Sequence, residues 1–350
     1  MTRTTTPRVT TPATTSSADP ARGAVSEMRA VVQDGYGDVG VLRSTRVPRP
    51  VPKDNEVLIR VHAAGLDRGT WHLMTGTPYL LRLGFGLRRP KNPVLGRDVA
   101  GTVVETGSAV TRFRVGDEVF GIAPGSFAEL AVAREEKVVA KPAGLSFEQV
   151  AVVPVSALTA LKSVVDVGRV QPGQKVLVLG ASGGVGSYAV QVAAAHGAEV
   201  TGECSAGKRD LVLSLGARHV LDYRRDDFAD GTRRYDLIID LGGNPPLRRL
   251  RRALAPGGTA VLAGGEGGDR LTGGMGRQLR GLVWSLFLRE RFAMSVPTER
   301  GSDLERLVRL LESGQVAPSI DRVYPLDEAP EAMARLAAGE VRGKVAIAVA

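Results

Sequence analysis

A glycine-rich turn between an apolar run and a helical pattern constrains the fold of this chain more than any other feature. Residues 175–179 (KVLVL) lead directly into residues 180–186 (GASGGVG), and a helical pattern covers residues 185–196. In dinucleotide-binding βαβ units, such a turn lets the backbone approach a diphosphate, and free N–H groups at the helix start favour its negative charge. We therefore predict a dinucleotide loop formed by Ser182, Gly183, Gly184, Val185 and Gly186.

Strand and helix patterns divide the 350 residues into two kinds of structure. Residues 28–140 show short alternating strands broken by Gly and Pro, which is typical of an all-β, barrel-like module. Beyond residue 154, apolar runs at 176–179, 199–203, 219–222, 237–240 and 259–263 alternate with helical stretches, which indicates a parallel sheet. Amphipathic helices are expected at 304–312 and 326–338, and we expect the strand pattern at 344–349 to rejoin the first module.

The predicted fold class is therefore α/β, with a doubly wound Rossmann sheet and a second, mainly β domain. Residues 1–27 are rich in Thr, Ser, Ala and Pro and show no apolar periodicity. Such a segment buries too little surface to offset its ordering entropy, so we predict a disordered tail.

Cysteine and histidine content limits the metal chemistry that the chain can support. The single cysteine, Cys204, excludes an internal disulfide and a four-cysteine zinc site. The four histidines are scattered and show no spacing typical of a metal site. We therefore predict no bound metal and a reducing, cytoplasmic setting.

The formal net charge of +9 does not by itself indicate a polyanionic partner. The basic residues are dispersed and aromatic residues make up only 5%, so we expect a solvated surface and no nucleic-acid partner. Residues 275–294 are apolar but interrupted by Arg277, Arg280 and Arg289, which excludes a bilayer span. We expect a core or dimer-contact helix there, or alternatively a substrate lid, and we expect no membrane partner.

Several motifs share the order and spacing of a known family. ASGGVG at 181–186, GSFAEL at 125–130, LTA at 158–160 and VRGKV at 341–345 resemble the motifs of zinc-free quinone oxidoreductases, which are medium-chain dehydrogenases and reductases. The resemblance covers residues 28–350. It implies a GroES-like catalytic domain formed by residues 28–154 and 299–350, with a Rossmann dinucleotide-binding domain at 155–298 between them. We also expect a homodimer.

The residue that ends the second parallel strand bears on the choice of nicotinamide cofactor. An acid there hydrogen-bonds the ribose of NAD, whereas nearby basic groups accommodate the 2′-phosphate of NADP. Glu203 occupies the acid position. The family resemblance instead implies a phosphate site formed by Ser205, Lys208 and Tyr223, with Thr159 near the nicotinamide. We predict NADPH as the cofactor and keep NADH as the alternative.

Zinc-dependent relatives carry a metal-binding cysteine after an AAG motif and a histidine in a GHE motif, whereas this chain has Asp67 and Arg97 at those positions. The resemblance therefore implies that no metal polarises a substrate carbonyl, and we expect Arg97 and Asp98 to form an ion pair there. Hydride addition to a conjugated C=C bond needs hydrogen-bond donors for the enolate and a proton for the α-carbon. The candidates are Asp67, His72 and Tyr79, although Asp67 is also suited to capping a helix.

The predicted function is zinc-independent, NADPH-dependent hydride transfer to a small molecule with a conjugated carbonyl, either an enone or a quinone. One alternative is an enoyl-thioester reductase of a biosynthetic pathway, for which the arginines at 82–89 would provide a basic path. Another is a dinucleotide-binding regulatory protein that keeps the fold but has little catalysis.

Overall fold

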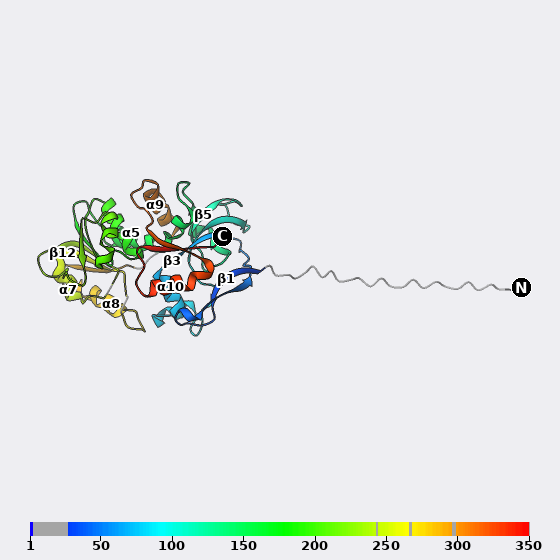
Figure 1. Ribbon diagram of the computed structural model, residues 1–350, viewed down its shortest axis with the longest axis horizontal. Helices are drawn as coiled ribbons and strands as arrows, with labels where there is room; N and C mark the ends of the chain where they lie inside the picture. Colours follow the sequence, from blue (N-terminus) through cyan, green and yellow to red (C-terminus); the bar gives the residue numbers. More distant parts are fainter. Residues whose placement is uncertain (3–26, 243, 266–267, 296–298, 350) are drawn as a thin grey trace.

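The computed structural model describes residues 1–2, 27–242, 244–265, 268–295 and 299–349. Figure 1 shows two lobes: one holds the middle of the chain, and the other brings the first strands together with the last strands and helix α10. The predicted disordered tail lies almost entirely outside the described residues. Glu27, its last residue, already begins the first strand.

A six-stranded parallel sheet forms the core of the first lobe, in the order β10-β9-β8-β11-β12-β13. Its strands are β8 (Lys175–Leu179), β9 (Glu199–Cys204), β10 (His219–Asp222), β11 (Tyr235–Asp240), β12 (Leu254–Leu262) and β13 (Arg291–Met294). The helices between them are α5 (Gly184–Ala195), α6 (Arg209–Ser214), α7 (Leu247–Ala253) and α8 (Met275–Trp284). The five predicted strands are confirmed to within about five residues at each end, and the helix predicted at 185–196 is confirmed as α5.

A seven-stranded sheet forms the core of the second, mainly β lobe, in the order β14-β15-β3-β4-β5-β7, with β6 beside β3. Its strands are β3 (Glu56–Leu66), β4 (Asp98–Thr106), β5 (Glu118–Ile122), β6 (Leu130–Arg134), β7 (Val138–Ala140), β14 (Ile320–Pro325) and β15 (Lys344–Ala348). Strands β1 (Glu27–Gln33) and β2 (Leu42–Pro48) form a separate antiparallel pair. Because β15 pairs with β3, strands from the two ends of the chain lie in one sheet.

Helices were underestimated in this lobe, because short helical segments follow strands without a long apolar period. They are α1 (Arg68–Thr75), α2 (Arg82–Phe85) and α3 (Phe147–Ala151). Later comes α4 (Pro154–Leu161), whereas α9 (Gly301–Glu312) and α10 (Ala329–Ala337) confirm the amphipathic helices expected at 304–312 and 326–338. Short 3-10 turns cover Val39–Val41, Tyr79–Leu81, Glu135–Lys137, Ala206–Lys208 and Leu326–Glu328, and a π-helical turn covers Lys162–Val167.

Of the alternatives for residues 275–294, a single core helix is wrong, whereas a dimer contact and a substrate lid stay predictions. Helix α8 ends at Trp284, and the residues that follow include the short strand β13, which pairs with β12. Phe292 and Ala293 are buried in that strand, whereas most apolar side chains of α8 are exposed. An apolar run of this length does not by itself distinguish a helix from a buried strand.

A continuous apolar cluster joins the two lobes. It contains Phe120 of β5, Tyr188 of α5 and Leu307 of α9, all fully buried. A backbone hydrogen bond of 2.9 Å from Gly343 N to Ser182 O links the final segment to the glycine turn. The predicted α/β fold class is confirmed, and the junction between the lobes lies beside the cofactor loop.

Candidate cofactor and active site

The glycine turn has the geometry of a diphosphate cradle. Gly180 has a φ of 78°, which a side chain would strain, and a Cβ at Gly186 would overlap the Gly180 carbonyl oxygen. Gly186 thus allows α5 to begin directly against β8. A Cβ at Gly183 would meet only the Gly180 oxygen, at 3.4 Å, so this position opens outward. No side chain caps α5, which leaves the positive end of the helix for an anion.

Glu203 lies near the end of β9, on the adenosine side expected from the fold. Burial raises the pKa of Glu203 to about 7, with a further increase from nearby Asp240 and an opposing effect of Arg249. The backbone N–H of Ala181 donates to the Glu203 carbonyl at 2.9 Å, which fixes this residue beside the turn. A carboxyl with a pKa of about 7 is roughly half neutral at pH 7, so it repels a neighbouring phosphate less than a full carboxylate would.

The predicted phosphate-binding residues lie around the end of β9 and the end of β10. Ser205 precedes the 3-10 turn Ala206–Lys208, and Tyr223 is exposed, with its N–H donating to the Cys204 carbonyl at 3.3 Å. Lys208 Nζ donates to the carbonyls of Gly339 (2.8 Å) and Val341 (2.7 Å). Lys208 therefore also has a structural role, because its side chain links the turn after β9 to the segment that follows α10.

Arg342 is a basic residue that sequence reasoning did not assign to this site. Burial lowers the pKa of Lys208, and the positive charge of Arg342 lowers it further, against the opposing effect of Asp321. Lys208 contacts the carbonyl of Val341, the residue before Arg342, although 134 positions separate the two basic residues in the sequence. The VRGKV motif was the available signal, but only the fold shows that it contacts Lys208.

A buried ion pair occupies the carboxyl end of β11. Arg277 of α8 donates to Asp240 at 2.6 Å, and its other terminal nitrogen donates to the Pro245 carbonyl at 3.0 Å. Burial raises the pKa of Asp240 to about 6 despite the stabilising charge of Arg277. This pair anchors α8 to the carboxyl end of β11, and no local sequence pattern indicates it.

Asp67 caps helix α1, as the alternative reading of this residue proposed. Its Oδ1 accepts from the Thr70 N–H at 2.7 Å and from the Thr70 hydroxyl at 3.2 Å. His72, on the same helix, has its Nδ1 2.6 Å from the Thr77 carbonyl oxygen. Tyr79 is exposed and stacks under the guanidinium of Arg82, 4.6 Å from the ring centre. The structure thus places Asp67 in the interior and Tyr79 at the surface.

The predicted Arg97–Asp98 ion pair is wrong. Arg97, just before β4, pairs instead with Glu299, whereas Asp98, the first residue of β4, is buried in the interior. Asp98 is fully buried and accepts from the Val155 N–H at 3.0 Å. The pKa of Asp98 is raised to about 8, mainly by burial and also by the negative charge of Asp67, against the opposing effect of Lys344.

Lys344 completes a buried polar cluster that sequence reasoning missed. Its Nζ donates to the Leu66 carbonyl at 3.0 Å and to the Ser156 hydroxyl at 2.9 Å. A Cβ at Gly184 would lie 3.2 Å from Lys344 Cδ, so the lysine stem packs directly on the cofactor loop. Asp67, Asp98, Ser156 and Lys344 therefore share the interior between the glycine turn and the first turn of α1.

The carboxyl oxygens of this cluster keep unused hydrogen-bonding capacity. Asp67 Oδ2 and Asp98 Oδ2 are both buried without a hydrogen-bond partner among the described residues.

Thr159 lies on α4, one turn beyond Ser156, and its hydroxyl donates to the Val155 carbonyl at 2.7 Å. The described residues contain no group of three or more His, Cys, Asp or Glu side chains placed to hold a metal ion.

Comparison with known proteins agrees with this arrangement. A model for the alcohol dehydrogenase GroES-like domain matches residues 53–143, and one for a zinc-binding dehydrogenase domain matches residues 215–347. The chain is 32% identical to a chloroplastic quinone-oxidoreductase homolog of Spinacia oleracea, over 91% of this chain and 98% of that protein. It belongs to the quinone oxidoreductase group of the medium-chain dehydrogenases and reductases.

Two further comparisons support the same family. The mitochondrial NAD(P)H oxidoreductase RTN4IP1 of Bos taurus is 33% identical, over 92% of this chain and 89% of its own length. The structure of a quinone oxidoreductase from Coxiella burnetii superposes with a TM-score of 0.82 at 28% identity, covering 93% of this chain and all of the other. This quinone oxidoreductase-like chain is therefore an enzyme, an NAD(P)H-dependent oxidoreductase. None of its described helices is long and apolar enough to cross a membrane.

Proposed function

We propose that this enzyme is a zinc-independent, NADPH-dependent reductase that transfers hydride to the conjugated system of an enone or a quinone. The observation that carries the proposal is the buried Asp67–Asp98–Lys344 cluster, which lies against the glycine turn and includes Asp67, at a position where zinc-dependent relatives carry a metal ligand. Such a cluster stores a proton next to a hydride donor. Reduction of a conjugated C=C bond needs both.

The residues of the Rossmann lobe, together with Arg342 of the catalytic lobe, would bind the cofactor in three sections. The N–H groups at the start of α5 would hold the diphosphate, with Gly183 leaving room for it. Ser205, Lys208, Tyr223 and Arg342 would surround the 2′-phosphate of NADPH, and the raised pKa of Glu203 reduces the repulsion that this acid exerts. Thr159, on the helix that enters the active site, would lie near the nicotinamide. NADPH, when bound, supplies a hydride.

The residues of the catalytic lobe would stabilise the negative charge that forms on the substrate and supply the proton that completes its reduction. Hydride addition to the β-carbon leaves negative charge on the carbonyl oxygen, which hydrogen-bond donors stabilise. Asp98, protonated in the folded protein near neutral pH, would share its proton with the free oxygen of Asp67, and Asp67 would deliver that proton to the reduced substrate. His72 and Tyr79 are the other proposed donors, because both follow Asp67 along the same segment.

The test is a comparison of NADPH oxidation with three acceptors: 1,4-benzoquinone, a simple enone and crotonyl-CoA. We expect turnover with the first two and little with crotonyl-CoA. Preference for crotonyl-CoA would favour an enoyl-thioester reductase and overturn the proposed substrate class. The conservative variant Asp67→Asn, which can still cap α1 through its amide oxygen, should lower kcat for the enone while leaving the affinity for NADPH unchanged.

Three sequence-based predictions extend this proposal. The substrate is a small molecule with a conjugated carbonyl, the active form is a homodimer, and the enzyme works in the cytoplasm. Sedimentation velocity would test the second prediction directly. A monomer that retains full activity would contradict it.

A further inference from the structure

Arg97 lies close to Asp67, although it is not part of the buried polar cluster. A Cβ on Gly69 would lie 2.9 Å from Asp67 Oδ1 and 3.7 Å from Arg97 Nη1, so both side chains border the same glycine in the first turn of α1. The two positions carry metal ligands in the zinc-dependent relatives, and the ligands of one zinc ion lie about 2 Å from it. Asp67 and Arg97 therefore converge on one point.

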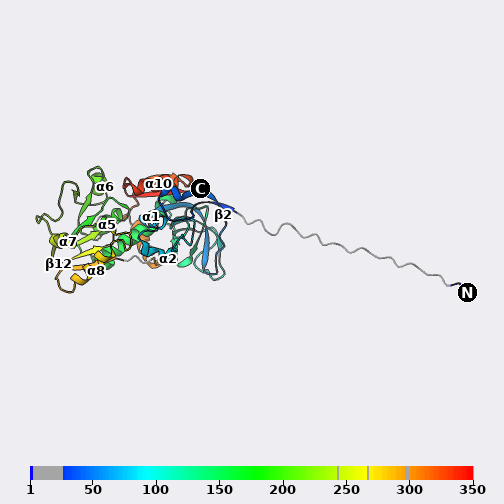
Figure 2. The same ribbon diagram turned by 90° about the horizontal axis from the view of Figure 1, so that it is seen from below.

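The first turn of α1 also lies beside the cofactor loop. Lys344, whose stem packs on Gly184, donates to the carbonyl of Leu66, the residue before Asp67. In Figure 2 helix α1 lies at the boundary between the two lobes. Asp67 and Arg97 are therefore on the side of the catalytic lobe that faces the cofactor loop.

The guanidinium of Arg97 keeps unused hydrogen-bond donors. Its Nη2 donates to the carboxylate of Glu299, two residues before α9, whereas Nη1 and Nε have no acceptor among the described residues. A guanidinium carries five N–H donors in a fixed plane. The side chain is 22% exposed, so it is open to a ligand while being largely shielded from water, which strengthens its charge interactions.

Two cations share the one acid at this point. Lys137 donates to the backbone carbonyl of Glu299, and its ammonium nitrogen lies 3.9 Å from Glu299 Oε2. Glu299 therefore neutralises Arg97 only in part. The charge of Arg97 also acts on the buried cluster: burial is the main cause of the raised pKa of Asp98, and the positive charge of Arg97 is among the effects that oppose it.

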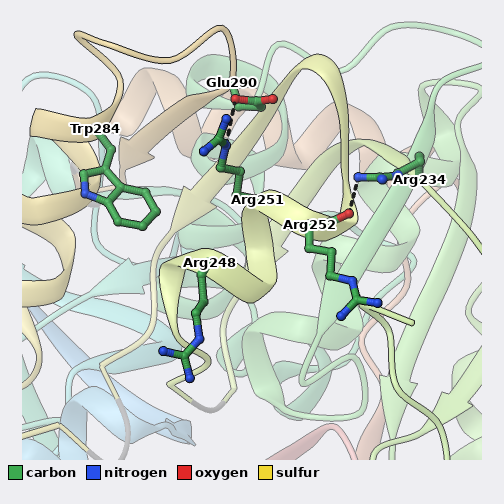
Figure 3. A pocket seen from close by; sticks show the side chains of 6 residues that line it. All are labelled: Arg234, Arg248, Arg251, Arg252, Trp284 and Glu290. Carbon is green, nitrogen blue, oxygen red and sulfur yellow. Dashed lines mark hydrogen bonds and ion pairs between the residues drawn. The ribbon is translucent and has the colours of Figure 1, made fainter. Parts of the chain in front are cut away.

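The arginines of the Rossmann lobe that surround a cavity of about 370 Å³ are not placed for the same role. Figure 3 shows Arg248, Arg251 and Arg252 projecting from α7 at this cavity. Arg234, which also lines it, comes directly before β11, so the cavity lies at the amino end of the parallel sheet. The glycine turn follows the carboxyl end of β8, at the opposite end of the sheet.

We propose that Arg97 is a catalytic residue that donates hydrogen bonds to the substrate oxygen on which negative charge develops. The inference rests on the proposed function, which supplies that oxygen. Hydride addition forms a C–H bond at the β-carbon of an enone and moves the carbonyl electron pair onto oxygen, while NADPH is oxidised to NADP⁺. The guanidinium keeps its protons and stabilises the enolate. The α-carbon then takes its proton from Asp67, so separate residues stabilise the charge and supply the proton.

Binding of 4-nitrophenolate tests the inference without turnover. In the complex of the full-length enzyme with NADP⁺, its anionic oxygen stands in for that of the enolate, and its visible absorbance distinguishes the phenolate from the neutral phenol. We expect Arg97→Gln to bind the phenolate roughly ten- to a hundred-fold more weakly than the wild type, because a charge-assisted contact is lost. The same variant should lower kcat for a simple enone about a hundredfold or more, with unchanged affinity for NADPH.

Glu299→Gln gives the decisive comparison, because it breaks the same ion pair from the other side. A purely structural ion pair predicts similar losses in Glu299→Gln and Arg97→Gln. A catalytic Arg97 predicts effects of opposite sign, since Glu299→Gln leaves the guanidinium without its neutralising acid and should bind 4-nitrophenolate at least as tightly as the wild type. The matched control is Arg112→Gln, which removes another ion pair to α9, with Glu305 at 3.1 Å, and should bind like the wild type.

Two results would overturn the inference. One is equal binding of 4-nitrophenolate, or an equal lack of binding, in the wild type and Arg97→Gln. The other is a loss of similar size in Arg97→Gln and Glu299→Gln. Failure of the proposed function gives a different result: the wild type would bind the phenolate through Arg97 yet reduce neither 1,4-benzoquinone nor the enone.

Discussion

Lys344 Nζ, on the last strand of the chain, lies 2.9 Å from Ser156 Oγ on the helix that leads into the cofactor-binding lobe. The same ammonium group donates to the Leu66 carbonyl at 3.0 Å. One buried side chain thus joins β3, α4 and β15 beside the glycine turn. Its removal would affect the junction between the lobes as well as the charge balance of Asp98.

Replacing Lys344 with methionine should preserve side-chain volume but remove the buried charge. Loss of one partner from a buried charged cluster costs about 3 kcal/mol in unfolding free energy, near the lower end of the measured range because Asp98 can stay protonated. Urea denaturation would measure the loss. Lys53→Met, at an exposed lysine, is the matched control and should change stability by less than about 0.5 kcal/mol. Equal stability of Lys344→Met and wild type would show that the cluster is not structurally important.

The buried carboxyl of Asp98 should make stability depend on pH. Its pKa is about 8 in the folded protein, against 3.8 for an ordinary Asp, so over this window the folded state holds a proton that the unfolded state has released. Stability should therefore fall as pH rises from about 4 to 8. Between pH 6 and 9 the expected loss is roughly 2–3 kcal/mol. Asp98→Asn cannot titrate, so its unfolding free energy should change much less over the same range. Parallel curves for the two proteins would contradict the assignment.

Two glycines of the cofactor turn should respond differently to substitution. Gly183→Val should fold normally, because a Cβ there has space and the φ of −84° suits any residue, yet it should weaken NADPH and NADH alike by filling the diphosphate site. Gly186→Val should lose the fold of the turn itself, because its side chain would overlap the Gly180 carbonyl. Thermal unfolding together with fluorescence titration of both cofactors separates the two effects. A Gly183→Val protein with wild-type cofactor affinity would mean that the diphosphate lies elsewhere.

The protein should contain no stoichiometric zinc when it is purified without chelator. The reason is the donor set: Asp67 and Arg97 replace the usual ligands, and Asp67 is already committed to capping α1. Elemental analysis gives the zinc content per chain directly. One zinc per chain that resists dialysis would disprove the prediction.

How far the sequence predicts this structure depends on the range of the interactions involved. The glycine turn was predictable because residues 175–186 carry the strand, turn and helix signals within twelve positions. The helix cap at Asp67 was foreseen for the same reason, as an interaction across three positions. The Arg97–Asp98 pair failed because Asp98 is buried at the start of β4, whereas the true partner of Arg97 is Glu299, two hundred positions away.

The buried Lys344 cluster could not be predicted from local patterns. It depends on antiparallel pairing of β15 with β3, which places residues from opposite ends of the chain in register. The exposure of α8 was likewise hidden, because its leucine, valine and tryptophan side chains are of types that usually fill a core. Only the packing of β13 on β12 shows that the sheet needs Phe292 and leaves Leu286 outside.

Cofactor choice is the sharpest test of the assigned site. Lys208 follows β9 and contacts the carbonyl of Val341, next to Arg342, so we expect a 2′-phosphate at this point to gain a charge-assisted contact from each of the two cations. Such a contact is worth about 1.5–3 kcal/mol, or roughly ten- to a hundred-fold in affinity. Arg342→Ala and Lys208→Ala should each weaken NADPH by that factor and barely change NADH.

The two variants control for each other, because their structural roles differ. Lys208 also holds the Gly339 and Val341 carbonyls, so Lys208→Ala should lower stability as well, whereas Arg342→Ala should not. Glu203→Gln removes the remaining acid beside the ribose and should strengthen NADPH binding, most clearly above pH 7 where the wild-type carboxyl is ionised. Paired titrations at pH 6 and 8 would measure this. If wild type prefers NADH at both pH values and Arg342→Ala leaves the affinity for NADPH unchanged, Glu203 governs the site and the cofactor is NADH.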